Sequence, residues 1–542
     1  MTFGSVKSEK KEFVVKKILN IFLAVVLTVI VSNTALALPS DKRITNGVIK
    51  EFEDFSTIPH CTFNEKEITK YFVKELKAMG ASVEVDSANN IIADIPATKG
   101  FENAPLTIIQ GHTDMVCAHT SDFDPVKDSI KIVVDKNLLK TDGRSSLGAD
   151  CGFNNAGLLW LFRTQKFDHG KIRFLLTASE EVGLVGAKKL DAKYLAGAKY
   201  LINLDGFYIG RIVTGSAGGR RVQYIHKNEY DTPKCDTAYE IKLSNLTGGH
   251  SGYDINKNRA NAIKYLAYAL MIVDRDLTPS GSAGEDLNLE LASISGGENH
   301  NVIPREAKAV VLVNKDKEDI FLSRVKKAQE ILSQYNCETG KNDLAKEDKG
   351  LTVTAEKTSV PDKVFSDDTK DDVILFLSEF YNGKYKFMKM YPNLVDTSSN
   401  LGLIQTTEDA VVCTLMMRFN EEEYKSQLRD KQNEVAKTFD FDENLLVEYG
   451  AWKPVENNPL VKIFSKSYKK VTGKNATCTA EHIGLEPSVL LEKNPNLLII
   501  STGCTIQNAH SVSETGDITT IPPYVKMMKK ALEEIAKEKQ NQ

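Results

Sequence analysis

An imidazole and a carboxylate two residues apart follow an apolar stretch near residue 110. Residues 106–109, Leu-Thr-Ile-Ile, predict a buried strand, and Gly111-His112-Thr113-Asp114 comes directly after them. Side chains two positions apart share one face of a strand, so His112 and Asp114 emerge together. A carboxylate beside a histidine fixes the ring for metal binding. The pattern therefore predicts a metal ligand supported by a carboxylate.

Further carboxylates and a second imidazole follow other predicted elements. Asp150 stands just before an apolar helical pattern, Glu180 and Glu181 follow a predicted strand over 171–178, Asp205 follows a strand over 200–204, and His510 lies in a glycine-containing loop after a strand over 497–500. Each feature alone is also typical of a helix cap or a solvated loop. Their recurrence favours one shared site, because open α/β sheets collect ligand-binding groups at the carboxyl ends of their strands.

The order of these motifs resembles the aminoacyl-histidine (Xaa-His) dipeptidases, a family of co-catalytic zinc exopeptidases. The resemblance runs from about Ile58 to near the C-terminus. It rests on His112-Thr113-Asp114-Met115-Val116, Leu147-Gly148-Ala149-Asp150, Glu180-Glu181, Leu204-Asp205-Gly206, Gly248-Gly249-His250-Ser251-Gly252, Asn301-Val302-Ile303-Pro304-Arg305, Thr397-Ser398-Ser399-Asn400 and Ala509-His510-Ser511.

The resemblance implies two divalent cations, expected to be Zn²⁺, and a catalytic role for seven side chains. His112 and Asp205 would hold one ion, Glu181 and His510 the other, and Asp150 would bridge both. Asp114 would orient His112, and Glu180 would be the general base. Such a centre hydrolyses a peptide bond by an activated water molecule, without a covalent enzyme intermediate.

The fold class expected is α/β, with a mixed-sheet catalytic domain of the zinc exopeptidase type and an inserted α+β lid domain. The stretch between Asp205 and His510 is too long for a connection within one sheet. We expect a catalytic domain in two parts, 38–218 and 450–542, and a lid over 219–449. Strands and helices recur in a similar order within the lid, which suggests a duplication whose second copy opens with the strand over 351–357.

Four lid residues are candidates for binding a short peptide. His250 lies in a glycine-rich turn, and in the family the matching histidine helps to stabilise the oxyanion. Asn301, Asn400 and Arg418 are polar or cationic groups near strand ends, and a guanidinium suits the terminal carboxylate of a substrate. A satisfied turn histidine, capping amides and a surface ion pair are the alternatives. A doubled lid could let one chain supply His250 to its own site, whereas a simple lid would require a homodimer.

Composition and the N-terminus limit the partners and the compartment. The 542 residues carry 69 Lys and Arg against 73 Asp and Glu, a net charge of -4, which argues against a nucleic acid partner. A lysine-rich start, an apolar stretch over 18–31 and Ala35-Leu36-Ala37 predict a signal peptide over 1–37. Cleavage would leave no stable membrane span and would export the enzyme to the periplasm or the medium; an uncleaved anchor is the alternative.

The cysteines and two departures from the family pattern complete the expectations. The eight cysteines are scattered without close pairs, which favours free buried thiols over a disulfide scaffold. Cys151 stands where many relatives carry Asn after the bridging carboxylate, at a peptide bond that is often cis in the family. Gly206-Phe207-Tyr208 replaces an acidic cluster that is common in the dipeptidases. These two changes leave open the role of Cys151, the metal preference and the preferred dipeptide.

The function expected is an exported, metal-dependent dipeptidase that acts on short unblocked peptides, with Xaa-His dipeptides as one candidate class. Two alternatives remain. One is an amidohydrolase that removes an acyl group from N-acyl amino acids, and the other is a catalytically silent peptide-binding protein of the same fold. Serine hydrolase and nucleotidase functions lack their motifs.

Overall fold

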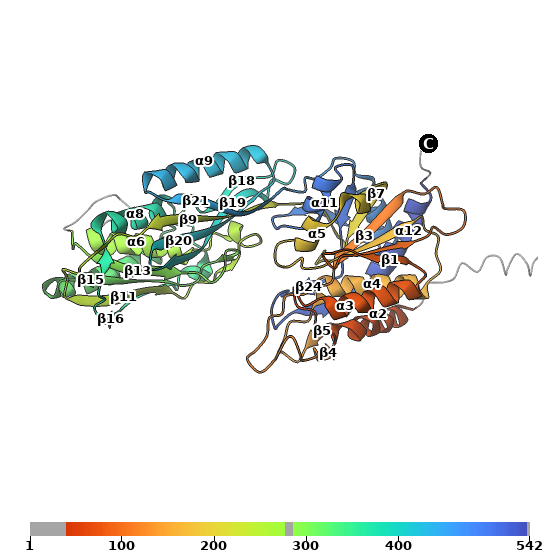
Figure 1. Ribbon diagram of the computed structural model, residues 1–542, viewed down its shortest axis with the longest axis horizontal. Helices are drawn as coiled ribbons and strands as arrows, with labels where there is room; N and C mark the ends of the chain where they lie inside the picture. Colours follow the sequence, from red (N-terminus) through yellow and green to blue (C-terminus); the bar gives the residue numbers. More distant parts are fainter. Residues whose placement is uncertain (1–39, 277–285, 539–542) are drawn as a thin grey trace, which may run out of the picture.

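The computed structural model describes residues 40–276 and 286–538 and forms two lobes side by side (Figure 1). One lobe contains both ends of the described chain, and the other contains the middle of it. The predicted signal peptide over 1–37 lies outside the described residues. Within the described ranges, no helix is long and apolar enough to cross a bilayer.

An eight-stranded mixed sheet forms the centre of the catalytic lobe. Its order is β1-β2-β6-β3-β7-β23-β8-β22, and the neighbours β6, β3, β7 and β23 are parallel. These four parallel strands are the apolar runs that the sequence predicted as strands. The bounds are β1 (Ser82–Val85), β2 (Ile91–Ile95), β3 (Leu106–His112), β6 (Ile172–Thr177), β7 (Ala198–Asn203), β8 (Arg211–Ser216), β22 (Thr477–Glu481) and β23 (Leu498–Ser501).

Helices cover both faces of this sheet, as a mostly parallel sheet requires. The larger core lies under α2 (Asp41–Ser56), α3 (Lys66–Ala78), α4 (Ala149–Thr164), α10 (Pro459–Thr472) and α12 (Ile521–Ala536). The smaller core on the other face lies under α5 (Val185–Lys189) and α11 (Pro487–Lys493). Helix α4 is buried on nearly every side, consistent with its apolar sequence.

A small antiparallel sheet is attached beside the start of α4. Its order is β24-β25-β5-β4, with bounds β4 (Ile132–Asp135), β5 (Leu138–Thr141), β24 (Ile506–Gln507) and β25 (Thr515–Asp517). The loop between β24 and β25 carries His510. The second predicted imidazole is therefore held by this small sheet, several residues beyond the end of β23.

The lid is built around one antiparallel sheet that contains two halves of identical strand order. Each half runs strand, helix, strand, strand, helix, strand, and the halves join edge to edge through β13 and β19. The first half comprises β11 (Thr237–Ser244), α6 (Ala262–Arg275), β13 (Glu290–Gly296), β15 (Ala307–Val313), α7 (Glu318–Leu332) and β16 (Thr352–Thr358). The second comprises β9 (Gly218–Lys227), α8 (Asp367–Glu379), β19 (Val395–Thr406), β20 (Ala410–Phe419), α9 (Glu422–Thr438) and β21 (Asp442–Tyr449).

The expected duplication is present, but its division differs from the prediction. The first half is inserted between β9 and α8 of the second, so the strand over 351–357 closes the first half instead of opening the second. The strand that opens the second half, β9, precedes the insertion. Two short ribbons complete the lid: β10 (Tyr230–Asp231) with β17 (Val364–Phe365), and β12 (Gly249–His250) with β14 (Val302–Ile303); in addition, β18 (Gly383–Phe387) pairs with β19.

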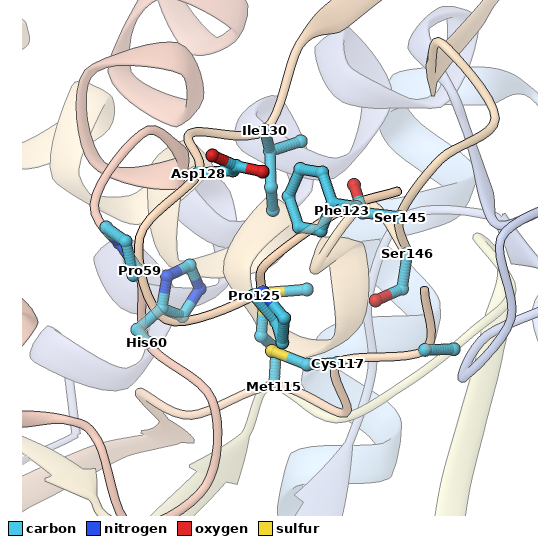
Figure 2. A pocket seen from close by; sticks show the side chains of 11 residues that line it. Pro59, His60, Met115, Cys117, Phe123, Pro125, Asp128, Ile130, Ser145 and Ser146 are labelled. Carbon is cyan, nitrogen blue, oxygen red and sulfur yellow. The ribbon is translucent and has the colours of Figure 1, made fainter. Parts of the chain in front are cut away.

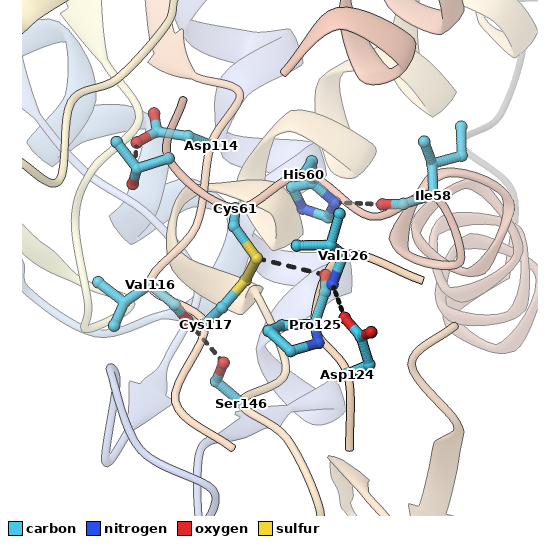
Figure 3. Close-up of a disulfide and its surroundings, with 11 residues drawn as sticks. Ile58, His60, Cys61, Asp114, Val116, Cys117, Asp124, Pro125, Val126 and Ser146 are labelled. Carbon is cyan, nitrogen blue, oxygen red and sulfur yellow. Dashed lines mark hydrogen bonds between the residues drawn. A yellow bond between two sulfur atoms is a disulfide. The ribbon is translucent and has the colours of Figure 1, made fainter. Parts of the chain in front are cut away.

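The prediction that the cysteines are free and buried is wrong for four of the eight. Cys61 and Cys117 form a disulfide with Cα atoms 5.5 Å apart (Figure 3). The pair is 56 residues apart in sequence, and a parallel bridge between Cys61 and Met115 brings the two segments together. Cys337 and Cys478 are free but half-buried. Long-range pairing of this kind leaves no trace in the spacing of the cysteines.

Candidate metal centre

Three parallel strands deliver most of the predicted ligands to one edge of the catalytic sheet. His112 is the last residue of β3, Asp205 follows β7 by two residues, and Glu180 and Glu181 follow β6. Because β6, β3 and β7 are parallel neighbours, their carboxyl ends meet at this edge. Glu180 and Glu181 lie in a turn beyond the strand, after Ser179 at a φ of 52°, and so they follow the strand as predicted.

Asp150 lies between the two predicted histidine ligands. It occupies the first turn of α4 with non-helical backbone angles, and its peptide bond to Cys151 is cis, as the family resemblance implied. Its Oδ1 lies 3.2 Å from Nε2 of His112, and its Oδ2 lies 3.1 Å from Nε2 of His510. The two oxygens of one carboxylate therefore face two different imidazoles, which is the arrangement of a bridging ligand.

Two more carboxylates complete the cluster. Oε2 of Glu181 lies 3.1 Å from Nε2 of His510, and ligand atoms of His112, Asp150 and Glu181 lie within 4.8 Å of one another. Asp205 is half-buried beside Asp150, whose carboxylate raises the pKa of Asp205 further above the level that desolvation alone produces. The structure thus brings His112, Asp150, Glu181, Asp205 and His510 together.

The electrostatics of the cluster favour cation binding. Burial raises the pKa of Glu181, and the nearby negative charge of Asp150 adds to that effect. Burial alone would lower the pKa of His510, but its hydrogen bonds to Asp150 and Glu181 outweigh that effect and raise the pKa. Crowded carboxylates repel one another, and a bound cation relieves that repulsion. Glu181 also keeps Oε1 buried without a hydrogen-bond partner. This mixed set of nitrogen and oxygen donors fits a pair of divalent cations.

Asp114 connects the first ligand to the predicted base. Its carboxylate accepts the backbone N–H of Glu180 at 2.9 Å and the N–H of Glu181 at 3.3 Å. Its Oδ1 lies 3.6 Å from Nδ1 of His112, and the hydroxyl of Thr62 donates to its Oδ2 at 2.8 Å. Nδ1 of His112 itself lies 2.9 Å from the backbone carbonyl oxygen of Asp114. Asp114 therefore orients the histidine through its backbone and holds the turn that carries the two glutamates through its buried carboxylate.

His250 lies in a turn of the lid that faces the catalytic lobe of the same chain. Its Nδ1 accepts the backbone N–H groups of Gly252 and Tyr253 at 3.1 and 3.3 Å. The ring proton must then lie on Nε2, which makes that nitrogen a hydrogen-bond donor. Burial and the charges of Arg418 and His510 lower the pKa of His250 to about 3, so the ring is neutral. Tyr253 and Asp205 line the same pocket, which places this lid turn against the catalytic lobe.

The other three lid candidates differ in their surroundings. Arg418 is buried, its guanidinium nitrogens lie 3.4 Å from the hydroxyl of Ser251, and no carboxylate of the described residues lies within 4.0 Å of it. Asn400 donates both amide hydrogens to the carbonyls of His300 and Val302, and its Oδ1 is buried without a partner. Asn301 pairs through its backbone carbonyl with the N–H of Ser251. Asn301 and Asn400 thus hold the ribbon that carries His250.

Several neighbouring residues were not predicted from the sequence. Glu514 accepts backbone hydrogen bonds at the start of α4, and Thr62 supports Asp114. Their partners are distant in sequence, so no local pattern marked them. Cys151 is buried with its sulfur against Gly111, and burial raises the pKa of its thiol, which disfavours the thiolate that a metal would need.

A small pocket near the disulfide contains none of the predicted ligands. Figure 2 shows Met115, Phe123, Pro125 and Ile130 around it, with the ring of His60 at its edge. His60 is fully buried, and burial lowers the pKa of its ring, which is therefore neutral. The pocket belongs to the packing that supports the segment after His112.

Comparisons with known proteins identify the family. The family model described as peptidase family M20/M25/M40 matches residues 108–534. The chain belongs to this family. This chain is 30% identical over 487 residues to the cytosol non-specific dipeptidase of Escherichia coli (strain K12), and the match covers 89% of this chain and 96% of that protein.

Solved structures agree with this assignment. Aminoacylhistidine dipeptidase from Vibrio alginolyticus matches this M20 chain with a TM-score of 0.73 and 28% identity over 90% of this chain and 96% of that one. Aminopeptidase PepT from Bacillus cereus shares the fold, with a TM-score of 0.52 and 17% identity over 91% of this chain and 99% of that one. The predicted resemblance and the fold class are confirmed, and the M20 chain is a metallopeptidase.

Proposed function

We propose that this protein is a dipeptidase that works with two Zn²⁺ ions. The observation that carries the proposal is that Oδ1 and Oδ2 of Asp150 face His112 and His510 separately. His112 and Asp205 would hold one ion and Glu181 and His510 the other, with Asp150 shared between them. Two such cations lower the pKa of a water molecule and polarise the scissile carbonyl.

Glu180 is the proposed general base. It is buried beside the centre, and burial followed by the charge of Glu181 raises its pKa, which favours uptake of a proton from the attacking water. Its backbone is fixed by Asp114, so the carboxylate has a defined position. The same group could then pass the proton to the leaving amine.

His250 is the proposed oxyanion donor. A neutral ring with its proton on Nε2 donates a hydrogen bond without bringing a full charge into the site. A donor fixed before the reaction stabilises the negative charge that develops on the carbonyl oxygen. Because the backbone N–H groups of Gly252 and Tyr253 hold Nδ1, the ring requires no rearrangement during the reaction.

Arg418 is the proposed partner of the substrate's terminal carboxylate. Within the described part of the chain no carboxylate forms an ion pair with the buried guanidinium of Arg418. Burial of an unpaired charge is costly, and a bidentate carboxylate of the substrate would offset that cost. Asn301 and Asn400 would act by holding the His250 ribbon, and the unpaired Oδ1 of Asn400 could accept a substrate N–H.

The substrate class follows from the site and the relatives. A site in which Arg418 binds the terminal carboxylate suits short unblocked peptides. The two relatives are named as a non-specific dipeptidase and an aminoacylhistidine dipeptidase, which makes Xaa-His dipeptides one member of that class. A small pocket beside Asp205 is lined by the rings of Phe207, Tyr208 and Tyr253 and by the charged side chains of Arg211 and Glu481. Gly206, Phe207 and Tyr208, which replace the acidic cluster common in the dipeptidases, thus form part of this pocket.

We also propose that the enzyme is exported. The residues before 38 have the pattern of a signal peptide. The Cys61–Cys117 disulfide supports this proposal, because disulfides persist in oxidising compartments and are rare in the cytosol. The related protein of Escherichia coli carries the word cytosol in its name, so the compartment would distinguish the two proteins.

A panel of dipeptides tests the function. The purified chain is assayed on Xaa-His and apolar dipeptides, on their N-acetylated forms and on N-acyl amino acids, before and after removal of metal by a chelator and readdition of Zn²⁺. We expect cleavage of free dipeptides alone, lost with the chelator and restored by Zn²⁺. Preference for the N-acyl substrates would instead establish an amidohydrolase, and a folded, metal-loaded protein inactive on every substrate would refute catalysis.

A further inference from the structure

Glu514 places its carboxylate against the first turn of α4. Its Oε2 accepts the backbone N–H groups of Leu147 and Gly148 at 2.9 and 3.0 Å, and its Oε1 accepts those of Ala149 and Asp150 at 3.0 and 3.2 Å. Four consecutive N–H groups thus converge on one buried side chain. The side chain comes from a segment more than 360 residues away in sequence.

This contact provides the cap that α4 lacks locally. The first N–H groups of a helix have no partners within the helix, and the residue at the cap position, Gly148, has no side chain to supply one. A carboxylate is the favourable group there, because the start of a helix carries partial positive charge. The capped turn is the one that presents Asp150, so Glu514 fixes the position of the bridging carboxylate.

The same residue is tied to the second histidine ligand. Glu514 lies four residues after His510 in the loop between β24 and β25, and its own N–H bonds to the carbonyl of Ser511 at 3.1 Å. His510 of the same loop also contacts this turn, with its Nε2 3.1 Å from Oδ2 of Asp150. Glu514 therefore fixes the separation between Asp150 and His510, two ligands that are 360 positions apart in sequence.

We propose that Glu514 is a positioning residue that preassembles the Asp150, Glu181 and His510 half of the metal centre. Glu514 fixes two ligands of the cation held by His510, namely His510 and Asp150, but only the shared Asp150 of the cation held by His112 and Asp205. Its loss should therefore weaken binding of the first of these cations more than binding of the second. This inference rests on the two-cation centre proposed above.

Metal titration of E514Q tests the inference. Glutamine has nearly the same shape, but its amide nitrogen cannot accept the N–H groups that one carboxylate oxygen accepts now. Metal-free protein is titrated with Zn²⁺ against a chromophoric chelator. We expect wild type to bind two ions, and E514Q to bind the ion held by His510 about 10 to 100 times more weakly, with a smaller loss of affinity for the ion held by His112 and Asp205. At saturating Zn²⁺, E514Q should regain most of its kcat with little change in KM.

A matched control separates positioning from general stability. Glu290 of the lid is also buried and accepts the backbone N–H groups of Lys234 and Cys235 at 2.8 to 3.1 Å, far from the ligands. E290Q should lower the melting temperature without changing either Zn²⁺ affinity. If E514Q does not fold, E514D keeps the charge on a shorter side chain and should show the same selective loss.

The outcomes distinguish this inference from the proposed function. Unchanged affinity for both ions in a folded E514Q, or equal weakening of both, would overturn the positioning role. A wild-type chain that binds two ions but cleaves no dipeptide would refute the dipeptidase proposal and leave the Zn²⁺ comparison between wild type and E514Q intact.

Discussion

The carboxylate of Asp114 accepts the backbone N–H of Glu180 at 2.9 Å. Asp114, which supports His112, therefore also fixes the backbone of the proposed general base. We expect D114N to lower kcat by about 10 to 100-fold with little change in KM, because the amide cannot replace the carboxylate toward both the turn and His112. The matched control is T62V, which removes one hydrogen bond to Asp114 and should have a smaller effect. Equal kcat in D114N and wild type would contradict this role.

Substitution of Glu180 by glutamine tests the acid–base chemistry separately from metal binding. We expect E180Q to lower kcat by about 10² to 10⁴-fold, because the amide cannot take a proton from water. The variant should keep both cations and its thermal stability, since Glu180 is not among the proposed ligands. Steady-state kinetics and metal analysis of the same preparation measure the two effects. Loss of metal in proportion to activity would make Glu180 a ligand instead of a base.

The disulfide is expected to matter for stability and for the site. Cys61 is adjacent to Thr62, which binds Asp114, and the bond closes a loop between residues 56 apart in sequence. We expect C61S, or reduction, to lower the free energy of unfolding by about 2 to 5 kcal/mol and to reduce kcat. Urea unfolding with and without a reductant measures the first effect. The control is C478S, at a free half-buried cysteine. This variant should keep the free energy of unfolding and the kcat of wild type, and a reductant should lower its stability as much as it lowers that of wild type.

An ion-pair cluster at the edge of the catalytic sheet predicts an acid-dependent loss of stability. Burial alone would raise the pKa of Asp94, but its bonds to Arg173 and Lys171 outweigh burial and lower it. A carboxyl group whose pKa is lower in the folded than in the unfolded protein stabilises the fold at pH values above its unfolded pKa of about 4. It loses that contribution as the pH falls through its pKa in the folded protein. D94N should therefore melt below wild type at pH 7, and the difference should shrink below about pH 3.5. A difference that persists at low pH would exclude this cause.

Mixing two inactive variants tests whether one chain completes its own site. His250 is held in the lid but acts, as proposed, on the centre of the same chain, since His510 lies near enough to lower its pKa. H250A and E180Q mixed and incubated together should stay inactive. If a partner chain supplied the histidine, a mixed dimer would contain one complete site, and activity would return. Analytical ultracentrifugation of the mixture identifies the species present.

Much of the catalytic lobe could be predicted because its central strands β3, β6, β7 and β23 are mostly apolar and mostly buried. His112, Glu180, Glu181 and Asp205 stand at or just after the ends of three of these strands. The lid was harder to predict. Strand β19 begins Val395-Asp396-Thr397-Ser398-Ser399-Asn400, which resembles a loop, yet these residues are buried because their polar groups find partners elsewhere. Ser398, for example, pairs with His482 of the catalytic lobe at 2.7 Å.

The supporting contacts of the site had no sequence signal. Glu514 and Leu147 are 367 positions apart, and only the folded chain brings them together. The nested order of the lid halves escaped prediction for a similar reason, because β9 pairs with β20 and β21 across the whole inserted half. The candidate ligands stand in local motifs that the sequence displays, whereas supporting residues such as Glu514 depend on distant neighbours and display none.

The chain enters and leaves the lid at one place. Ser216 and Trp452 exchange backbone hydrogen bonds of 2.8 and 3.0 Å, so the outgoing and returning segments lie side by side. The lid is therefore a single insertion in the catalytic lobe, and the two ends of this insertion are already paired. Lengthening such an inserted segment costs little loop-closure entropy. Enzymes of this architecture can therefore gain, lose or exchange whole lids during evolution, and with them the choice of peptide, while the residues around the cations stay unchanged.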